Sequence, residues 1–232
     1  MNDPKISFVI PSKDRVAWLP ECLSGLQAQT VKEIEIVVVN DGSTDGTKEL
    51  LDNWYSKDKR IKIIHNPENR GAGISRNIGN NAAQAEIIGV CDSDDCYPIG
   101  RAEEILKFFE KYPKGIMMNA PYVRIDYCLK ILRRFEGEEF DEKRFKKDGY
   151  VNYFCHPSAA YTRQDIFDIG GYKPETKLKT DDLQLVEDWI KAGKKIGFAP
   201  EHYLCMHRVL PGSIMANMRG FQPEWTGGKG YI

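Results

Sequence analysis

The sequence predicts an α/β fold with a mainly parallel central sheet flanked by helices. Short apolar runs rich in β-branched residues alternate with amphipathic segments through residues 1–98, which is the pattern of successive βαβ units. Several runs end abruptly in polar residues, as strands do at the carboxyl edge of an open parallel sheet, where such folds bind ligands. At 232 residues the chain is long enough to bury a substantial core, and we expect a single domain over residues 1–232.

The first half of the chain alternates regularly between strand-like and helix-like segments. We expect strands over residues 6–10, 34–40, 61–64 and 86–91, and helices over residues 17–29, around Leu50, Leu51 and Trp54, and over 71–83. The first strand is expected to stop at Pro11, because proline cannot donate to a strand ladder. Right-handed crossovers then place the loops at residues 11–15, 41–45 and 92–95 along one edge, facing a common crevice.

Residues 99–205 are less regular. We expect helices over residues 102–112 and 181–192, and short strands over 116–118 and 196–200. Residues 129–149 mix both charge signs densely, which favours a solvated surface excursion over a binding patch. In the loop-like segment 206–232, Phe221, Trp225 and several glycines suggest either a lid over a site or a disordered end.

Composition excludes several classes of protein. A formal net charge of -1 gives no reason to expect general nucleic-acid binding, which requires a strongly basic face. The sequence shows neither a signal peptide nor an apolar stretch long enough to span a bilayer, so a cytoplasmic location is expected. The six cysteines include no C-x-x-C pair and are expected as reduced, buried thiols. Convergence of Cys155-His156 with Cys205 and His207 on a metal is a minor alternative.

The most informative stretch is an apolar run over residues 87–91 that ends in Asp92, Asp94 and Asp95. Clustered carboxylates repel one another unless a positive charge lies between them, and oxygen-only ligands suit Mg²⁺ or Mn²⁺ shared with phosphates. The same residues would also serve as an Asp/Ser turn that caps the next helix. This stretch alone leaves both interpretations open.

Taken together, six segments resemble the family-2 glycosyltransferases. The segments in chain order are Ile6-Ser7-Phe8-Val9-Ile10-Pro11, residues 38–47 with Asp41-Gly42-Ser43-Thr44-Asp45-Gly46, residues 69–77 with Asn69-Arg70-Gly71, Asp92-Ser93-Asp94-Asp95, Gly170-Gly171-Tyr172 and Asp181-Asp182. The resemblance covers nearly the whole chain to about Ser213. It implies a Rossmann-like GT-A fold with a nucleotide-sugar-binding half (1–98), an acceptor-binding half (99–205) and a C-terminal loop or lid (206–232). It also implies an inverting enzyme that transfers sugar from a nucleoside-diphosphate sugar to an acceptor hydroxyl, with a UDP-sugar favoured.

The resemblance assigns roles to individual residues. Asp94 would ligate Mn²⁺ or Mg²⁺ directly, while Asp92 would contact ribose or metal-bound water. The metal would neutralise charge on the departing nucleoside diphosphate. Arg76 would lie near the diphosphate, and Asp95 would support the loop. The remaining donor-binding residues are expected to be Pro11, Lys13, Arg15, Asp41 and Ser93, with Asp41 accepting a hydrogen bond from a base N–H.

The resemblance also suggests a general base. Asp182 matches the catalytic Asp of the family, whereas Asp181 stands where relatives have Glu, a departure that leaves its role open. Both carboxylates would otherwise serve as N-terminal helix charges. Leu210 stands where relatives often carry His. His207 and Arg208 lie a few residues earlier and could contact the diphosphate, but His207 is not assigned as a metal ligand.

Two other functions fit parts of the pattern. A nucleotidyltransferase also combines a parallel sheet with metal-binding acids, but residues 11–15 lack the glycines of its phosphate loop. A catalytically silent nucleotide-sugar-binding module would need neither Asp94 nor Asp182. The acceptor pocket is expected within residues 121–158. Its sequence does not distinguish a polysaccharide from a lipid-linked glycan, a protein or a modified nucleobase, and the oligomeric state is equally open.

Overall fold

The computed structural model describes residues 3–55, 57–148, 154–176 and 180–210. The larger sheet consists of β1 (Ile6–Ser12), β2 (Ile34–Asp41), β3 (Ile61–Asn66), β4 (Ile87–Val90), β5 (Ile116–Asn119), β8 (Ala160–Thr162) and β9 (Lys195–Phe198). The smaller sheet consists of β6 (Tyr122–Ile125), β7 (Ile131–Phe135) and β10 (Cys205–Arg208). The helices are α1 (Leu19–Gln27), α2 (Thr47–Tyr55), α3 (Ala72–Ala82), α4 (Arg101–Lys111), α5 (Glu142–Asp148), α6 (Arg163–Asp168), α7 (Asp181–Lys191) and the 3₁₀ turn η1 (His156–Ser158).

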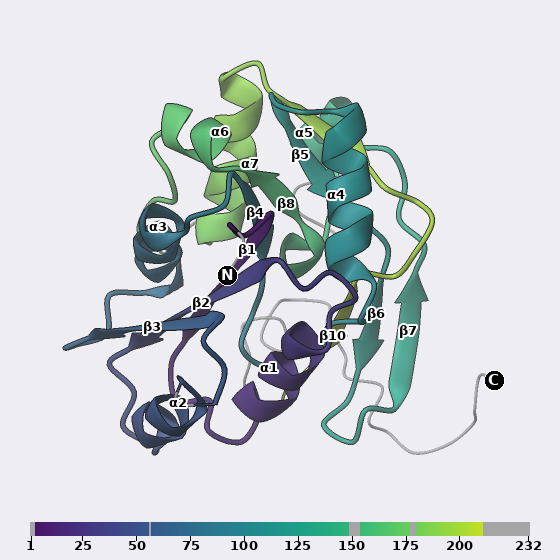
Figure 1. Ribbon diagram of the computed structural model, residues 1–232. Coiled ribbons are helices and arrows are strands. Elements are labelled where there is room, and N and C mark those ends of the chain that lie inside the picture. Colours follow the sequence, from purple (N-terminus) through teal and green to yellow (C-terminus); the bar gives the residue numbers. More distant parts are fainter. Residues whose placement is uncertain (1–2, 56, 149–153, 177–179, 211–232) are drawn as a thin grey trace.

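The larger sheet has the strand order β3-β2-β1-β4-β8-β5-β9 and is mainly parallel (Figure 1). Strands β1 to β4 pair in parallel, as do β5 and β9, whereas β8 runs antiparallel to both of its neighbours. The smaller sheet has the order β10-β6-β7 and lies beside α1 and α4. The predicted α/β class with a mainly parallel sheet is confirmed.

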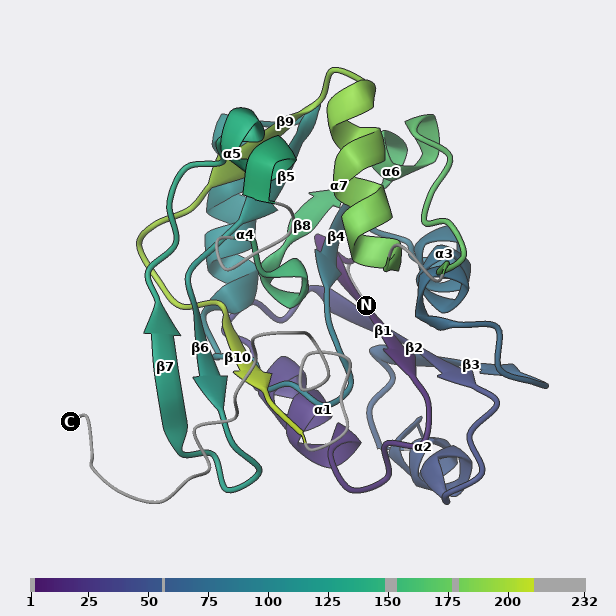
Figure 2. The same cartoon turned by 180° about the vertical axis from the view of Figure 1, so that it is seen from behind.

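Helices cover both faces of the larger sheet, which explains why β1 and β2 are buried along their whole length. Alternate residues of β1 face opposite sides. Phe8 and Ile10 pack in a core with residues of α1, α2 and α4, while Val9 packs in a second core with residues of α6 and α7. Figures 1 and 2 show these helices on the two faces. Among the described residues, no helix is long and apolar enough to cross a membrane.

The prediction that Pro11 ends the first strand is wrong. Strand β1 continues to Ser12, and Pro11 lies opposite Val39 of β2. Pairing of β1 with β4 ends at Val9, so Pro11 lies where β1 has a neighbour on one side only. A proline is tolerated in a strand at such a place because no ladder bond needs its missing N–H.

Residues 129–149, expected as a solvated surface excursion, are only partly solvated. The segment forms β7 and α5, and Phe135 and Phe145 are buried within it. Strand β7 is exposed at four of its five positions, which explains why its sequence appears solvated. Residues 205–208 form β10 and belong to the folded core, rather than starting a lid. Phe221 and Trp225 lie outside the described residues.

Candidate functional site

The three loops expected to share one edge do meet there. The backbone N–H of Asp14 donates to Ser43 Oγ (2.9 Å), and the N–H of Arg15 donates to Thr47 Oγ1 (3.0 Å). The side chain of Arg15 extends in the other direction, where its Nε donates to Asp94 Oδ2 (3.2 Å). The loop after β1 therefore connects the loop after β2 to the acidic loop after β4.

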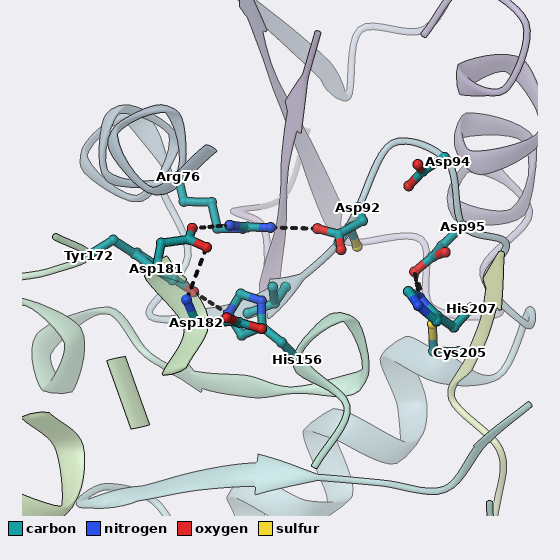
Figure 3. A network of polar contacts seen from close by, with 12 residues as sticks. Arg76, Asp92, Asp94, Asp95, His156, Tyr172, Asp181, Asp182, Cys205 and His207 are labelled. Atoms are coloured by element: carbon teal, nitrogen blue, oxygen red, sulfur yellow. Dashed lines mark hydrogen bonds and ion pairs between the residues drawn. The ribbon is translucent and has the colours of Figure 1, made fainter. Parts of the chain in front are cut away.

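Asp95 anchors the acidic loop instead of facing the site. Its carboxylate is fully buried and accepts hydrogen bonds from Arg208 N (2.8 Å), His207 Nδ1 (3.2 Å) and Cys205 Sγ (3.4 Å), all in β10 (Figure 3). Burial alone would lower the pKa of His207, but the Asp95 carboxylate outweighs it and raises the pKa to about 10. His207 is therefore a partly buried cation paired with Asp95. Arg208 is more deeply buried and pairs with Glu21.

A second set of contacts fixes the backbone of the loop from the side of α4. The N–H of Asp92 donates to Tyr97 Oη (2.7 Å). Arg101 lies over the ring of Tyr97 and donates from Nη2 to the carbonyl of Val90 (2.6 Å), at the end of β4. These buried contacts hold the main chain so that the carboxylates of Asp92 and Asp94 project from a rigid edge.

Asp94 carries a strongly unfavourable charge. Burial and the neighbouring carboxylates of Asp95 and Asp92 raise its pKa to about 6, although Arg15 offsets part of this effect. Burial would also raise the pKa of Asp92, but the guanidinium of Arg76 outweighs it, so the net shift is downward. A cation bound next to the Asp94 carboxylate would therefore stabilise its charged form.

Arg76 joins the acidic loop to α7. Its Nη2 donates to Asp92 Oδ1 (2.6 Å) and its Nη1 donates to Asp181 Oδ2 (2.5 Å), as Figure 3 shows. The side chain is buried, yet the two carboxylates raise its pKa well above the ordinary value against the effect of burial. Its Nε is also buried, and it has no hydrogen-bond partner among the described residues.

Gly73 permits this arrangement. It lies in the first turn of α3, where a Cβ atom would come within 3.0 Å of Asp181 Cβ and 3.1 Å of the carbonyl of Lys173. Because any side chain here would push Asp181 or Lys173 away, glycine allows the N-terminal ends of α3 and α7 to approach closely. The close approach brings Asp181 within reach of Arg76.

Asp182 lies next to the Arg76 network and has one carboxylate oxygen without a partner. Its Oδ1 accepts from Thr180 Oγ1 and from Leu183 N (2.8 Å), while its N–H donates to Asp181 Oδ1 (3.0 Å). Within residues 154–176 and 180–210 and the rest of the described chain, no hydrogen bond engages Oδ2. The side chain is partly exposed. The site thus offers a fixed carboxylate with an accepting oxygen.

Tyr172 and His156 complete the site, although the sequence placed Tyr172 only in the Gly170-Gly171-Tyr172 segment and His156 only in the alternative metal centre. His156 Nε2 and Tyr172 Oη lie 2.8 Å apart, and the ring of Tyr172 lies 5.5 Å from the Arg76 guanidinium carbon. Burial, followed by the charge of Arg76, lowers the pKa of His156. The Gly170-Gly171-Tyr172 segment in the sequence pointed to Tyr172. No spacing of residues around His156 indicates that its side chain lies beside Tyr172.

Asp41, expected to bind the nucleoside, is buried and organises the loop after β3. It accepts hydrogen bonds from Asn66 Nδ2 (2.8 Å), Arg70 N (2.9 Å) and Gly71 N (2.9 Å). A carboxylate has about four lone-pair positions, so one remains for a ligand. The other expected donor-binding residues lie nearby in sequence or space: Lys13 contacts Asp14 and the carbonyl of Gly42, Pro11 lies near the end of β1, and Ser93 is buried in the acidic loop.

The alternative metal centre of cysteines and histidines does not form among the described residues. All six cysteines are free thiols, and five of them are buried as expected, whereas Cys128 is exposed. Cys205 and His207 both contact Asp95, whereas His156 contacts Tyr172. The group of metal-ligating side chains that does converge within the described part of the chain is Glu104, Glu201 and His202, away from the acidic loop.

Comparison with known proteins identifies the family. The model of the family described as Glycosyl transferase family 2 matches residues 7–170, which is more than half of the chain. This chain belongs to glycosyltransferase family 2. The matched residues include the loops that follow β1, β2 and β4, the last of which contains the Asp92–Asp95 segment.

Individual relatives agree with this assignment. The chain is 38% identical over 225 residues to the glycosyltransferase GlyG of Streptococcus pneumoniae, a match that covers 90% of this chain and 72% of GlyG. In five other curated relatives, the match with this chain spans only 18% to 43% of the relative's length.

Solved structures confirm the fold. TarS of S. aureus in complex with UDP-GlcNAc superposes with a TM-score of 0.74 at 20% identity, covering 92% of this chain and 61% of that one. The mannosyltransferase PcManGT of Pyrobaculum calidifontis in complex with GDP-Man and Mn²⁺ superposes with a TM-score of 0.67 at 19% identity, covering 93% and 60%. The fold is therefore the GT-A fold expected from the resemblance.

Proposed function

We propose that this family-2 glycosyltransferase is a metal-dependent, inverting enzyme that transfers a sugar from a nucleoside-diphosphate sugar to an acceptor hydroxyl. The observation that carries the proposal is the bridge from Asp92 through Arg76 to Asp181, which is followed directly by Asp182. The bridge supports the proposal because Arg76, which would bind the diphosphate, lies between the proposed metal loop and the proposed base. Neither a silent binding module nor a simple helix cap requires this combination.

The residues of the acidic loop fit Mn²⁺ or Mg²⁺. Asp94 is a carboxylate with a raised pKa, and it forms an ion pair with Arg15 at 3.2 Å. Asp92 offers a second carboxylate, whereas Asp95 is fully engaged by β10. One or two protein carboxylates, completed by water and phosphate oxygens, are the usual protein share of such a site. When bound, the metal would neutralise the charge that develops on the departing nucleoside diphosphate.

The remaining steps follow from the protein groups. Arg76 would bind a diphosphate oxygen in a charge-assisted hydrogen bond, since a guanidinium presents several donors in a fixed plane. The acceptor oxygen would attack the anomeric carbon while the bond from that carbon to the phosphate oxygen breaks. Asp182 would take the acceptor proton on Oδ2. A single displacement of this kind inverts the anomeric centre.

A UDP-sugar is the proposed donor. Asp41 is positioned to accept a hydrogen bond from a base N–H, and its remaining lone pair suffices for one such contact. TarS was solved with UDP-GlcNAc and PcManGT with GDP-Man, so the structural neighbours support a nucleotide sugar without fixing the base.

Product analysis tests the proposal. The protein is incubated with a panel of UDP- and GDP-sugars, Mn²⁺ and simple sugar acceptors, and the products are separated by anion-exchange chromatography. We expect free nucleoside diphosphate and a product of inverted anomeric configuration by NMR. Release of pyrophosphate would indicate nucleotidyl transfer, and retention of configuration would contradict Asp182 as a base in a single displacement.

A further inference from the structure

The loop between β6 and β7 and the first part of β7 form an apolar projection, which we call the hairpin tip (residues 126–134). Four large apolar side chains are exposed there: Tyr127 (54%), Leu129 (49%), Ile131 (44%) and Leu132 (37%). These are four of the eight large hydrophobic side chains exposed among the described residues, gathered within six positions. Single exposed apolar residues are ordinary, but a contiguous group indicates a contact surface.

The same projection carries cations. Lys130, Arg133 and Arg134 are exposed, and Arg133 lies directly across the strand pair from Arg124. Both of these guanidinium groups lie over the ring of Phe135, at 4.7 Å and 4.6 Å from its centre. Like charges directly opposite one another are unfavourable in a sheet, and an anion placed against them would relieve the repulsion.

The acids near the tip have other partners. Asp126 accepts hydrogen bonds from Cys128 N (2.8 Å) and Lys130 N (2.9 Å), which closes the loop. Beyond the far end of β7, Glu136 binds Tyr203 and Glu138 binds Arg144. The hairpin is therefore positive and apolar at its tip, and its acids are used within the fold.

Leu129 occupies a backbone conformation that does not suit leucine. Its φ is 64°, in the left-handed region where glycine and asparagine are favoured. The loop is closed by hydrogen bonds from Leu129 N to Asp126 O (3.2 Å) and from Asp126 N to Lys130 O (3.0 Å), and neither bond requires a leucine side chain. An exposed leucine held at a strained position indicates that its side chain contributes to a contact outside the fold.

We infer that the hairpin tip docks on the surface of an anionic lipid bilayer. The apolar side chains would enter the boundary between headgroups and acyl chains, while the cations would bind lipid phosphates. A projecting hairpin suits a surface of this kind, because β7 forms the outer edge of the smaller sheet and lies at the side of the molecule in both views (Figures 1 and 2).

Docking at the tip would bring the proposed site to the bilayer. Arg208 donates from Nη1 to the carbonyl of Tyr127 (3.3 Å) and from Nε to the carbonyl of Asp94 (2.8 Å). One buried cation therefore connects the tip to the acidic loop. If the proposed function holds, the acceptor is a lipid-linked glycan or another acceptor carried at that surface. The docking itself does not depend on the reaction.

Vesicle sedimentation with the full chain tests the docking. The protein is mixed with vesicles of phosphatidylcholine alone or of phosphatidylcholine and phosphatidylglycerol in equal parts. One variant, Leu129→Asn with Leu132→Ser, removes apolar groups, and its asparagine suits the backbone of residue 129. A second variant replaces Lys130, Arg133 and Arg134 with Gln.

The matched controls are Ile99→Ser and a triple replacement of Lys57, Lys59 and Lys114 with Gln, all exposed positions away from the tip. Thermal unfolding verifies that each variant is folded.

We expect binding to the anionic vesicles and not to phosphatidylcholine alone. The triple tip variant should bind about a hundredfold more weakly, and the leucine variant about tenfold more weakly. Both controls should bind like the native chain.

The inference is overturned if the native chain does not sediment with anionic vesicles or if the controls lose binding equally. It is also overturned if soluble polyglutamate binds as tightly without dependence on Leu129, which would indicate an acidic protein partner. Nucleoside diphosphate release measured without vesicles separates failure of docking from failure of the proposed function.

Discussion

Arg76 and Asp181 form a buried ion pair of 2.5 Å between α3 and α7, although 105 positions separate them in the sequence. The same guanidinium pairs with Asp92 at the end of β4. One cation therefore fixes the distance between the acidic loop and the helix that carries Asp182. The pair resists separation of the acidic loop from α7, because Asp92 and Asp181 would both lose this cationic partner if it broke.

Removal of the Arg76 charge should destabilise the protein strongly. We expect Arg76→Met to lower the free energy of unfolding by about 3 kcal/mol, because Asp92 and Asp181 would be left uncompensated in a buried place. Denaturant unfolding measures this change. Adding Asp181→Asn to Arg76→Met should recover part of the loss. The matched control is Lys173→Met, whose ion pair with Asp188 is exposed on the lysine side and should contribute less than about 1 kcal/mol. Equal effects of the two single changes would contradict the bridging role.

Replacement of the proposed base should separate binding from turnover. We expect Asp182→Asn to slow donor turnover by about 10²- to 10⁴-fold, the usual contribution of a general base. Donor affinity measured by calorimetry should stay within about threefold, because the amide keeps the contacts of Oδ1 to Thr180 and Leu183. Asp188→Asn on the same helix serves as a control with native turnover. Undiminished turnover in Asp182→Asn would exclude this residue as the base.

Asp94 and Asp95 should respond oppositely to neutralisation. The pKa of Asp94 is raised to about 6, so its charge opposes folding above that pH and has no effect below its ordinary pKa, where the carboxyl is protonated in both states. At neutral pH without metal, Asp94→Asn should therefore stabilise the protein, by about 1–2 kcal/mol. Asp95→Asn should destabilise it by about 1–3 kcal/mol, because three donors of β10 lose a charged acceptor.

Thermal unfolding with and without Mn²⁺ completes this comparison. The native chain should gain stability on addition of the metal, since a ligand that binds only the folded state raises its stability. Asp94→Asn should lose that gain. A native response to Mn²⁺ in Asp94→Asn would assign the metal to other residues.

The ion pair of His207 with Asp95 should make stability depend on alkaline pH. Because the folded pKa of His207 is raised to about 10, its contribution is complete below the ordinary value of about 6.5 and is lost as the pH rises through about 10. NMR titration of the four histidines should find one imidazolium that persists above pH of about 8. That signal should be absent from His207→Gln. Titration of all histidines near the ordinary value would show that the pair is not charged.

Much of the donor half could be predicted because its signals are local. The strands of residues 1–98 are apolar runs that end in polar loops, and parallel topology alone brings Arg15, Asp41 and Asp94 to one edge. In the second half, the signals depend on tertiary contacts. Strand β7 is exposed on both sides and β8 has only three residues, so neither shows a strand period. His156 acquires its position from packing against Tyr172.

The sequence also could not predict which hydrogen-bond and ion-pair partners the site residues have. Asp181 and Arg76 were both singled out, but their pairing depends on the close approach that Gly73 allows between two helices. The same limit applies to Asp95, whose role in anchoring β10 requires three donors from residues more than a hundred positions away. Patterns in sequence indicate which chemistry is present, whereas long-range packing decides which groups meet.

The proposed function depends most on the metal dependence of donor cleavage, and one assay measures it directly. Release of nucleoside diphosphate from a panel of nucleotide sugars is followed with Mn²⁺ present and after chelation, for the native chain and for Asp94→Asn. We expect release from one class of donor, loss of that release on chelation and in the variant, and recovery of the native chain when Mn²⁺ is restored. Release that is equal with and without metal would contradict the assignment of Asp92 and Asp94 to a metal–diphosphate site.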